Sequence, residues 1–267
     1  MTRRKFLKMA GGSFLACTAT YAVGDYYAYQ MKLDRRELRL PKWDADGFRI
    51  VQVSDLHADR PRSAARARQA LEMAVSLKPD ALLITGDFFS NHDPLSDKSL
   101  VHALEPLQEA RCPVLGILGN HDYKCGIGRL YRVIKGSNVK ILCNKKAEVR
   151  GVTIAGYDDG LFGNPDPRFI DLTNVSRSMI SMVHEPDYVA TVPTNSSLVL
   201  AGHSHGGQIC MPNGKPFYTH LGALTYYSGY YPDAPAPLFV SNGVGTVGPD
   251  IRLFCPPEIN ELTLRSA

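Results

Sequence analysis

Short apolar runs rich in Val, Ile and Leu set the pattern of the chain between positions 49 and 201. They cover residues 49–53, 81–85, 114–118, 152–155, 179–183 and 198–201, and runs of this length predict buried β-strands. Helical patterns follow the first two runs, at 64–77 and 99–110, and a shorter one lies at 126–135. Because parallel neighbouring strands need a crossover of about this length, the alternation predicts βαβ units.

Beyond His205 the helical patterns stop, and Gly, Pro and Tyr separate short strands up to Arg265. We expect this half of the domain to be antiparallel. Because layers of secondary structure must bury their apolar faces against one another, the whole pattern predicts an α/β domain of two packed sheets with helices outside. Residues 25–47 are predicted to be a polar connector with a short strand at 37–40, and residues 48–267 the domain proper.

The first 24 residues have the features of an export signal. Arg3 and Arg4 belong to a basic stretch at 2–8, and a weakly apolar stretch follows at 9–23. This order resembles a twin-arginine signal, which the export machinery reads as an address. The apolar stretch is shorter than the roughly 20 residues that cross a bilayer comfortably, and cleavage after Ala22 fits its small residues. We expect an exported, extracytoplasmic protein; an uncleaved membrane anchor and a basic cytosolic tail are the alternatives.

Charge and cysteine content narrow the classes of function. The formal net charge is +4, and basic residues before position 9 supply all of it, so residues 25–267 are neutral. Proteins that bind nucleic acid usually present a basic face, so nucleic acid is a disfavoured partner. The chain has 6 cysteines without a CxxC pair, and we expect small buried side chains in place of a disulfide framework. Arg62, Arg66 and Arg68 are expected on a solvated helix face.

Potential metal ligands follow the apolar runs, where each predicted strand ends. The segments are Ser54-Asp55-Leu56-His57, Gly86-Asp87, Gly119-Asn120-His121-Asp122, His184-Glu185 and Gly202-His203-Ser204-His205. In open α/β sheets the carboxyl ends of strands form the crevice that binds ligands, so these distant segments would meet. Oxygen and imidazole ligands without thiolate suit divalent Mn, Fe, Zn or Co better than Ca or Mg. A bridging aspartate can hold two ions about 3.5–4 Å apart, which suits phosphoryl chemistry.

These ordered motifs resemble the calcineurin-like metallophosphoesterase superfamily over residues 48–262. The stretches at 202–208, 241–245 and 252–259 resemble its twin-arginine-exported bacterial phosphodiesterase branch, of the YaeI and YkuE type. The resemblance implies a four-layer α/β/β/α sandwich, in which two packed mixed β-sheets are flanked by helices. It also implies two divalent metal ions as cofactors.

The same resemblance implies a role for each motif residue. The first ion would be bound by Asp55, His57, Asp87 and His205, and the second by Asp87, Asn120, His184 and His203. Asp87 would be the bridge, and a metal-activated hydroxide the nucleophile. His121 would stabilise developing charge or protonate the leaving oxygen, and Asp122 would hold His121 in its working tautomer. No ligand position departs from the superfamily pattern.

The implied function is a phosphodiesterase or pyrophosphate hydrolase acting on a cell-envelope lipid or nucleotide-sugar lipid, such as a UDP-diacylglucosamine. The alternatives are an exported nuclease, a phosphoprotein phosphatase, and a metal-binding envelope protein without turnover. The expected partners are a phosphate-ester substrate, the export machinery and a membrane surface. An aromatic cluster either packs loops or binds acyl chains: Phe217, Tyr218, Tyr226, Tyr227, Tyr230 and Tyr231. His102 and His220 are taken as ordinary structural residues, while His92 is close enough to Asp87 in sequence to reach the cleft.

Overall fold

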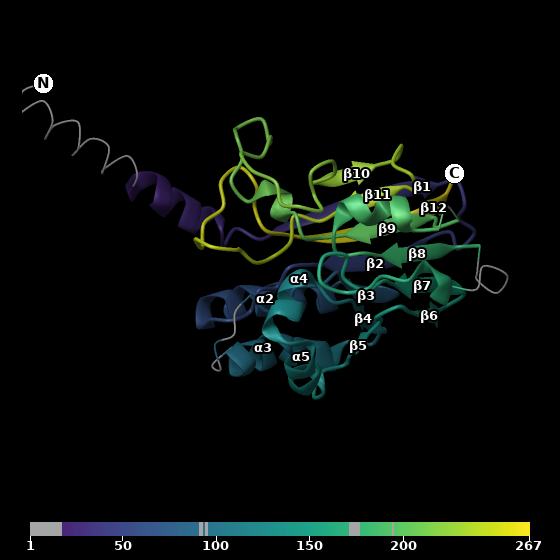
Figure 1. The fold of residues 1–267 in the computed structure, drawn as a ribbon, viewed down its shortest axis with the longest axis horizontal. Helices are drawn as coiled ribbons and strands as arrows, with labels where there is room; N and C mark the ends of the chain where they lie inside the picture. The colour runs from purple at the N-terminus through teal and green to yellow at the C-terminus, as the bar shows by residue number, and fades with distance from the viewer. Residues whose placement is uncertain (1–17, 91–92, 94–95, 171–176, 194) are drawn as a thin grey trace, which may run out of the picture.

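The computed structural model of the protein describes residues 18–90, 93, 96–170, 177–193 and 195–267 (Figure 1). The predicted export motif with Arg3 and Arg4, and also His92, lie outside these residues. Residues 18–27 form a helix that projects from one end of the domain (Figure 1). Within the part of the chain that is described, no helix combines the length and apolar character needed to cross a bilayer.

Two mixed six-stranded sheets form the centre of the domain. The first sheet has, in spatial order, β1 (Lys32–Leu40), β12 (Glu258–Ser266), β2 (Phe48–Val53), β3 (Ala81–Ile84), β4 (Val114–Gly116) and β5 (Val139–Ile141). The second has β10 (Gly229–Tyr231), β11 (Leu238–Val240), β9 (Leu198–Ala201), β8 (Met179–Met182), β7 (Val152–Gly156) and β6 (Lys145–Val149). All six strands predicted from apolar runs are present, each within two residues of its predicted ends.

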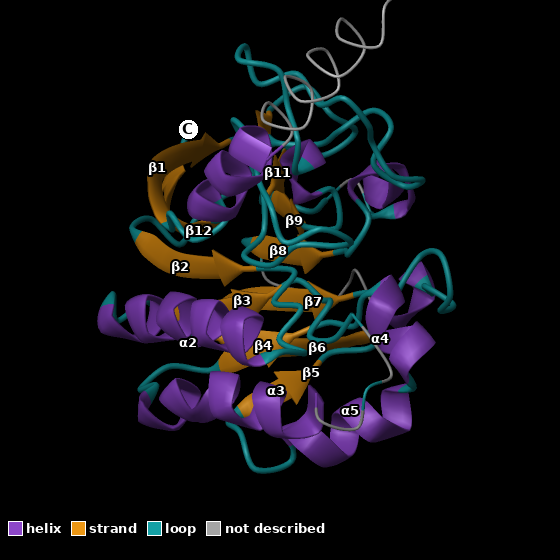
Figure 2. Ribbon diagram, turned by 90° about the vertical axis from the view of Figure 1, so that its left-hand side faces the viewer, coloured by secondary structure: helices purple, strands orange, loops and turns teal. Residues whose placement is uncertain are grey.

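Helices cover the outer face of the first sheet (Figure 2). The α-helices are α2 (Pro61–Ser76), α3 (Ser96–Leu104), α4 (Asn120–Cys125) and α5 (Ile127–Ile134). Short 3-10 helices are η1 (Glu105–Glu109), η2 (Pro167–Phe169), η4 (Pro186–Thr191) and η5 (His205–Gly207). The β2-α2-β3 and β3-α3-β4 segments join parallel strands, which confirms the predicted crossovers.

Three apolar clusters correspond to the three interfaces between layers. Val51 and Val53 of β2 face the helices, whereas Ile50 of the same strand faces the second sheet, as the two-residue period of a strand requires. A third cluster lies on the outer face of the second sheet, where η4 contacts β9 and β11. The predicted fold class, two packed mixed sheets with helices, is confirmed, and the layer over the second sheet is built from η4 and loops.

Two expectations about the sheets were wrong. The strand predicted at 37–40 is longer, and the whole of β1 pairs in parallel with β12, so the predicted connector contributes a strand to the first sheet. The half beyond His205 is mixed, because β11 is parallel to β9 while β10 is antiparallel to β11. The connection from β9 to β11 consists of loops, the short η5 and β10, so it makes the crossover without the helical pattern that reveals one in sequence.

Arg66 corrects the expectation of a solvated face on α2. Its side chain is buried, and Nη1 donates to Ala28 O at 3.1 Å and to Asp250 Oδ1 at 2.8 Å. The hydroxyl of Tyr29 donates to Asp250 Oδ2 at 2.6 Å. These bonds fix the end of the N-terminal helix against the domain, on the side where the candidate site lies.

Candidate metal centre

The predicted ligands converge at the carboxyl ends of strands from both sheets. Asp55 and His57 follow β2, and Asp87 follows β3. Asn120 is the first residue of α4, and residues 117–119 connect it to the end of β4. The second sheet contributes His184 after β8, and His203 and His205 after β9. All seven side chains are buried or nearly so, which places the site inside the domain.

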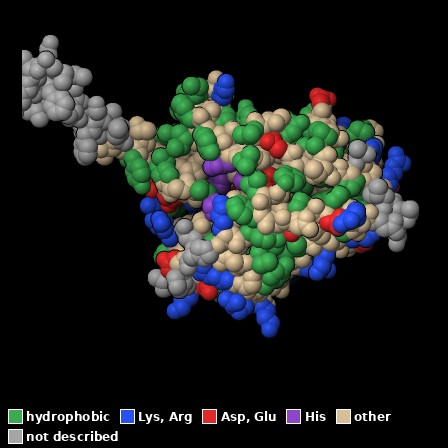
Figure 3. Space-filling view, in the orientation of Figure 1, with side chains coloured by type: hydrophobic (Ala, Val, Ile, Leu, Met, Phe, Trp, Pro, Cys, Tyr) green, Lys and Arg blue, Asp and Glu red, His purple; other side chains and the backbone are tan. Residues whose placement is uncertain are grey.

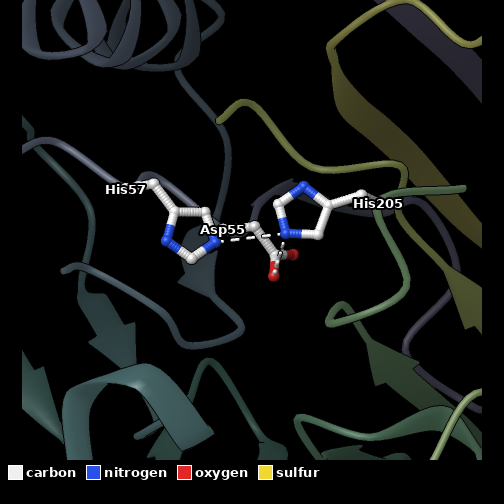
Figure 4. A group of neighbouring side chains, drawn as sticks. All are labelled: Asp55, His57 and His205. Atoms are coloured by element: carbon white, nitrogen blue, oxygen red, sulfur yellow. Dashed lines mark hydrogen bonds and ion pairs between the residues drawn. The ribbon is translucent and has the colours of Figure 1, made fainter. Parts of the chain in front are cut away.

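Asp55, His57 and His205 form one group of potential metal ligands (Figure 4). The two imidazole rings face each other across the Asp55 carboxylate, with 3.1 Å between His57 Nε2 and His205 Nε2. His205 Nε2 lies 3.6 Å from Asp55 Oδ1. Ligand atoms about 2.1 Å from a common ion are roughly 3.0–3.4 Å apart, so these spacings fit a metal ion between them.

Asp87 links this group to a second group of potential ligands, which includes His184. Its Oδ2 atom lies 3.6 Å from His57 Nε2 and 3.3 Å from His184 Nε2. Despite that short distance, His184 Nε2 has no hydrogen bond, and Asn120 Oδ1 is likewise buried without a partner. Because buried polar atoms nearly always have a partner, unpaired atoms on two of the predicted ligands fit a site that binds an ion. The donor set of these residues therefore fits a pair of divalent cations that share Asp87.

Hydrogen bonds decide which nitrogen of each ring is free for a metal. His57 Nδ1 lies 3.1 Å from Phe89 O, and His184 Nδ1 lies 2.7 Å from Thr85 O, so both rings donate there and Nε2 is the nitrogen available to a metal. His203 has the opposite arrangement, with Nε2 at 2.8 Å from Leu221 O. Burial lowers the pKa values of His57 and His203 to about 3, which keeps both rings neutral and their lone pairs available.

The backbone is held in an uncommon conformation at the site. Positive φ angles occur at Asp55 (52°), His57 (44°), Asp87 (57°), His203 (68°) and His205 (51°). Non-glycine residues avoid this region, and runs of such residues mark sites where the fold imposes the geometry of side chains. Bonds from Asp55 N to Gly86 O at 3.0 Å and from His57 N to Asp87 O at 3.1 Å impose it here.

Asp122 does not have the position predicted for it. Its carboxylate accepts backbone N–H groups from Asp87, Phe88, Phe89 and Gly119, at 2.9–3.1 Å. The His121 ring instead has Nδ1 at 3.3 Å from Ser90 O. The assignment of Asp122 as the partner of His121 is therefore wrong, because the four backbone donors take up both carboxylate oxygens. Asp122 fixes the loop that carries Asp87.

Two residues near the site were not predicted. The His220 ring lies 5.9 Å from the ring of His203, although its position gave no signal in the sequence. Arg252 is fully buried, donates to Gly245 O at 2.6 Å, and has Nη2 at 3.4 Å from His205 Nδ1. Arg252 lies in one of the stretches that carried the family resemblance, but only the tertiary contacts reveal its place behind His205.

Cysteines form no disulfide in the described parts of the chain. Five are free; Cys125, Cys210 and Cys255 are buried as expected from the sequence, whereas Cys112 and Cys143 are only partly buried.

Two cavities meet at the metal centre. The larger, about 580 Å³, is lined by residues that include His57, Arg60 and Ser90. The smaller, about 350 Å³, is lined by residues that include Asp87 and His203. His121 and Val247 line both cavities. Histidine side chains are visible at the bottom of a hollow between hydrophobic side chains (Figure 3).

Residues 48–207 match the model of the calcineurin-like phosphoesterase family. The chain belongs to this family. It is 30% identical to YkuE, an uncharacterized metallophosphoesterase of Bacillus subtilis strain 168, over 100% of this chain and 98% of that protein. It is 27% identical to phosphodiesterase YaeI of Escherichia coli K12, over 99% of both chains. It is also 27% identical to LpxG of Chlamydia muridarum, named a UDP-2,3-diacylglucosamine pyrophosphatase, over 86% of this chain and 88% of that one.

The crystal structure of TT1561 from Thermus thermophilus resembles this fold, with a TM-score of 0.51 over 74% of this chain and 90% of that chain. Its sequence identity is 13%, so the likeness concerns the fold alone. Family membership and the buried clusters of His and Asp together make this protein a metal-dependent phosphoesterase with the dinuclear type of site.

Proposed function

We propose that this metallophosphoesterase cleaves a phosphodiester or pyrophosphate in a lipid-linked substrate of the cell envelope. The observation that carries the proposal is the pair of cavities, of about 580 and 350 Å³, that meet at His121. A phosphomonoester has one organic substituent on phosphorus, whereas a diester or pyrophosphate needs room for two. A reacting phosphate beside His121 would have space for a substituent in each cavity.

In this proposal the seven predicted ligands hold two ions of Mn, Fe, Zn or Co. Asp55, His57, Asp87 and His205 hold the first, and Asp87, Asn120, His184 and His203 hold the second. Bound ions of this kind polarise the phosphate and lower the pKa of water. Among the described residues, His121 is the non-ligand imidazole that lines both cavities. Its Nδ1 faces Ser90 O, so the imidazolium form would carry its second proton on Nε2 and give that proton to the leaving oxygen. The backbone N–H of His121 donates to Asp87 Oδ1 at 2.8 Å and thereby orients the bridging carboxylate.

The relatives support the chemical class of the substrate. YaeI is named a phosphodiesterase, and LpxG is named a pyrophosphatase of a diacylated nucleotide sugar. Both names describe a phosphorus with two substituents. The neutral charge of residues 25–267 weighs against the nuclease alternative. The basic and apolar order of residues 2–23 supports export by the twin-arginine machinery to an extracytoplasmic location, with cleavage after Ala22 or retention as an anchor.

A substrate panel with one pair of variants tests the proposal. Metal-loaded protein should have a higher kcat/KM for bis(p-nitrophenyl) phosphate than for p-nitrophenyl phosphate, and it should cleave a diacylated UDP-glucosamine. Ser63 lines the larger cavity, so Ser63→Trp should lower kcat/KM for the diester about tenfold and leave the monoester nearly unchanged. Ser76→Trp is the control, because Ser76 is exposed at the other end of α2. Each substitution removes one hydrogen bond from a serine hydroxyl to a backbone oxygen, Ser63 to Arg60 O or Ser76 to Met73 O.

Two results would contradict the proposal. A preference for the monoester would make the enzyme a phosphomonoesterase. Degradation of single-stranded DNA at rates comparable to those of the lipid substrate would favour the nuclease alternative.

A further inference from the structure

Exposed apolar side chains line the smaller cavity or lie in the loop that contributes Leu221 to it. We call this group the apolar collar: Phe162 (53% exposed), Phe217 (67%), Tyr218 (68%), Leu221 (67%) and Leu224 (62%). Phe162 and Leu221 line the cavity itself, together with His121 and His203. Large apolar side chains with exposures above one half, in and next to the lining of one cavity, mark a surface for a partner.

The collar is fixed to the metal centre. Leu221 O accepts the hydrogen bond from His203 Nε2 at 2.8 Å. The Tyr218 ring packs edge-on against His220, with 5.2 Å between ring centroids. Leu224 N donates to Asp187 Oδ2 at 2.7 Å. Hydrogen bonds to His203 and Asp187 and the ring contact with His220 therefore tie parts of the collar to the domain.

The aromatic cluster identified in the sequence divides into two parts. Tyr226 and Tyr231 pack against the cluster that covers the second sheet, and Tyr230 packs between the two sheets. These tyrosines stabilise the fold. Tyr227 is partly buried, and Phe217 and Tyr218 belong to the exposed collar, so these two are the members most available to a partner.

The charges around the collar suit an anionic lipid surface. Residues 204–232 contain no Asp or Glu, and Lys215 is their one Lys or Arg. Lys124 Nζ lies 5.0 Å from the centre of the Phe162 ring, at the edge of the collar. Two acidic residues also contact the collar, and their carboxylates accept backbone N–H groups, Asp159 from Phe162 and Asp187 from Leu224. Apolar side chains with basic neighbours are typical of surfaces that enter the headgroup region of a membrane.

The N-terminal helix points to the same partner. The helix of residues 18–27 leaves the domain at the end where the loop of residues 208–228 lies (Figure 1). Tyr21 lines the larger cavity, which meets the smaller one at His121, and Tyr26 is exposed. The chain before this helix is basic at 2–8 and apolar at 9–17. If the segment is retained as an anchor, its composition adds a second element that binds membranes.

We propose that the apolar collar docks on the surface of a membrane that contains anionic lipids, so that the mouth of the metal centre opens onto the headgroups. A lipid-linked phosphate could then reach the site without leaving the bilayer. The inference deepens the proposed function and rests on it for the choice of substrate, whereas docking itself is measurable without turnover.

Fluorescence quenching by lipid tests docking directly. The chain has 1 Trp, Trp43, which is only 3% exposed, so an introduced Trp at the surface reports its own surroundings. Leu224→Trp places the probe in the collar. Val101→Trp places it on α3, at a residue that is 48% exposed and outside the collar. Both full-length variants are mixed with phosphatidylglycerol vesicles that carry bromine on the acyl chains, which quenches only a Trp that enters the bilayer.

We expect the Leu224→Trp fluorescence to fall at least about twofold, and the Val101→Trp and unmodified proteins to change little. Equal quenching at both positions would mean that the chain is merely tethered, and no quenching would mean that the collar stays in water. Either result would overturn the proposal. A third result would also overturn it: the Trp introduced at Leu224 is shielded from water without vesicles, and light scattering shows that the protein is a dimer. A second copy of the chain would then cover the collar.

A second readout separates this inference from the proposed function. A double variant carries Phe217→Ser and Leu224→Ser. It should hydrolyse a soluble chromogenic diester at an unchanged rate, and it should hydrolyse diacylated UDP-glucosamine in vesicles about tenfold more slowly. If the Trp is quenched but every lipid substrate is inert, docking stands and the proposed function fails. If the unmodified protein and the double variant cleave lipid equally well, and the Trp of Leu224→Trp is not quenched, the collar inference fails and the proposed function stands.

Discussion

Replacement of Asp122 by Asn tests whether this residue supports the Asp87 loop or orients His121. Asp122 Oδ1 accepts from Phe88 N at 2.9 Å and from Phe89 N at 3.1 Å. Oδ2 accepts from the backbone N atoms of Asp87 and Gly119, each at 3.0 Å. Asn has one acceptor oxygen and an NH₂ group in place of the other, so two buried N–H groups lose their acceptor. Each such loss costs about 1–3 kcal/mol, which gives a destabilisation of roughly 2–6 kcal/mol.

The expected result is a large change in stability and in metal binding. At about 2–4 °C per kcal/mol for a protein of this size, Asp122→Asn should lower the Tm of the metal-loaded protein by roughly 5–20 °C. Metal content should fall as well, because the loop that distorts contains Asp87. Asp166→Asn is the control. The Asp166 carboxylate also accepts a hydrogen bond from a backbone N–H, that of Arg168, but at the protein surface and away from the site. The measurements are thermal unfolding and metal analysis of both variants.

A different outcome would restore the role predicted from the sequence. If Asp122→Asn keeps its Tm and its metals but shifts the pH dependence of kcat, the carboxylate acts through His121, and the support role assigned from the structure is wrong.

Three further predictions concern the centre itself. His121→Ala should retain both metals and lose roughly 100-fold to 10,000-fold in kcat, and loss of metal would show that His121 is a ligand. Gly86→Ala should weaken metal binding at least tenfold, because Gly86 has φ +95° and an added Cβ would lie 2.5 Å from His184 Nδ1; unchanged titration calorimetry would contradict this. Burial raises the pKa of Asp55 to about 6 in the metal-free site. Since bound metal needs the ionised form, affinity should fall about tenfold per pH unit below pH 6, and a flat affinity from pH 7 to 5 would refute the assignment.

The positions of the ligands were predictable because of the order of apolar and polar residues. Each ligand motif directly follows a buried strand or strand region, as Asp55 follows β2 and Asp87 follows β3. Parallel strands place such residues at one edge, so the meeting of distant segments follows from the strand pattern alone. The alternation of strands and helices likewise predicted the crossovers that build the first sheet.

Other features depend on contacts that no local pattern reveals. β1 has the sequence of a polar connector because most of its residues are exposed or only partly buried, and only its pairing with β12 makes it a strand of the sheet. Asp122 stands next to His121 in sequence, yet its partners include backbone N–H groups more than thirty residues away. Arg252 and Leu221 owe their places beside His205 and His203 to loops whose paths are fixed by tertiary packing.

The most direct test of the dinuclear centre is the metal content of the purified protein, measured beside its phosphodiesterase activity. We predict about two divalent ions per chain, loss of activity when they are removed, and recovery when they return. Because Asp87 Oδ2 faces both His57 and His184, Asp87→Asn should lower the stoichiometry and abolish hydrolysis. Full activity of Asp87→Asn with unchanged metal content, or full activity of the metal-free wild type, would contradict the central claim.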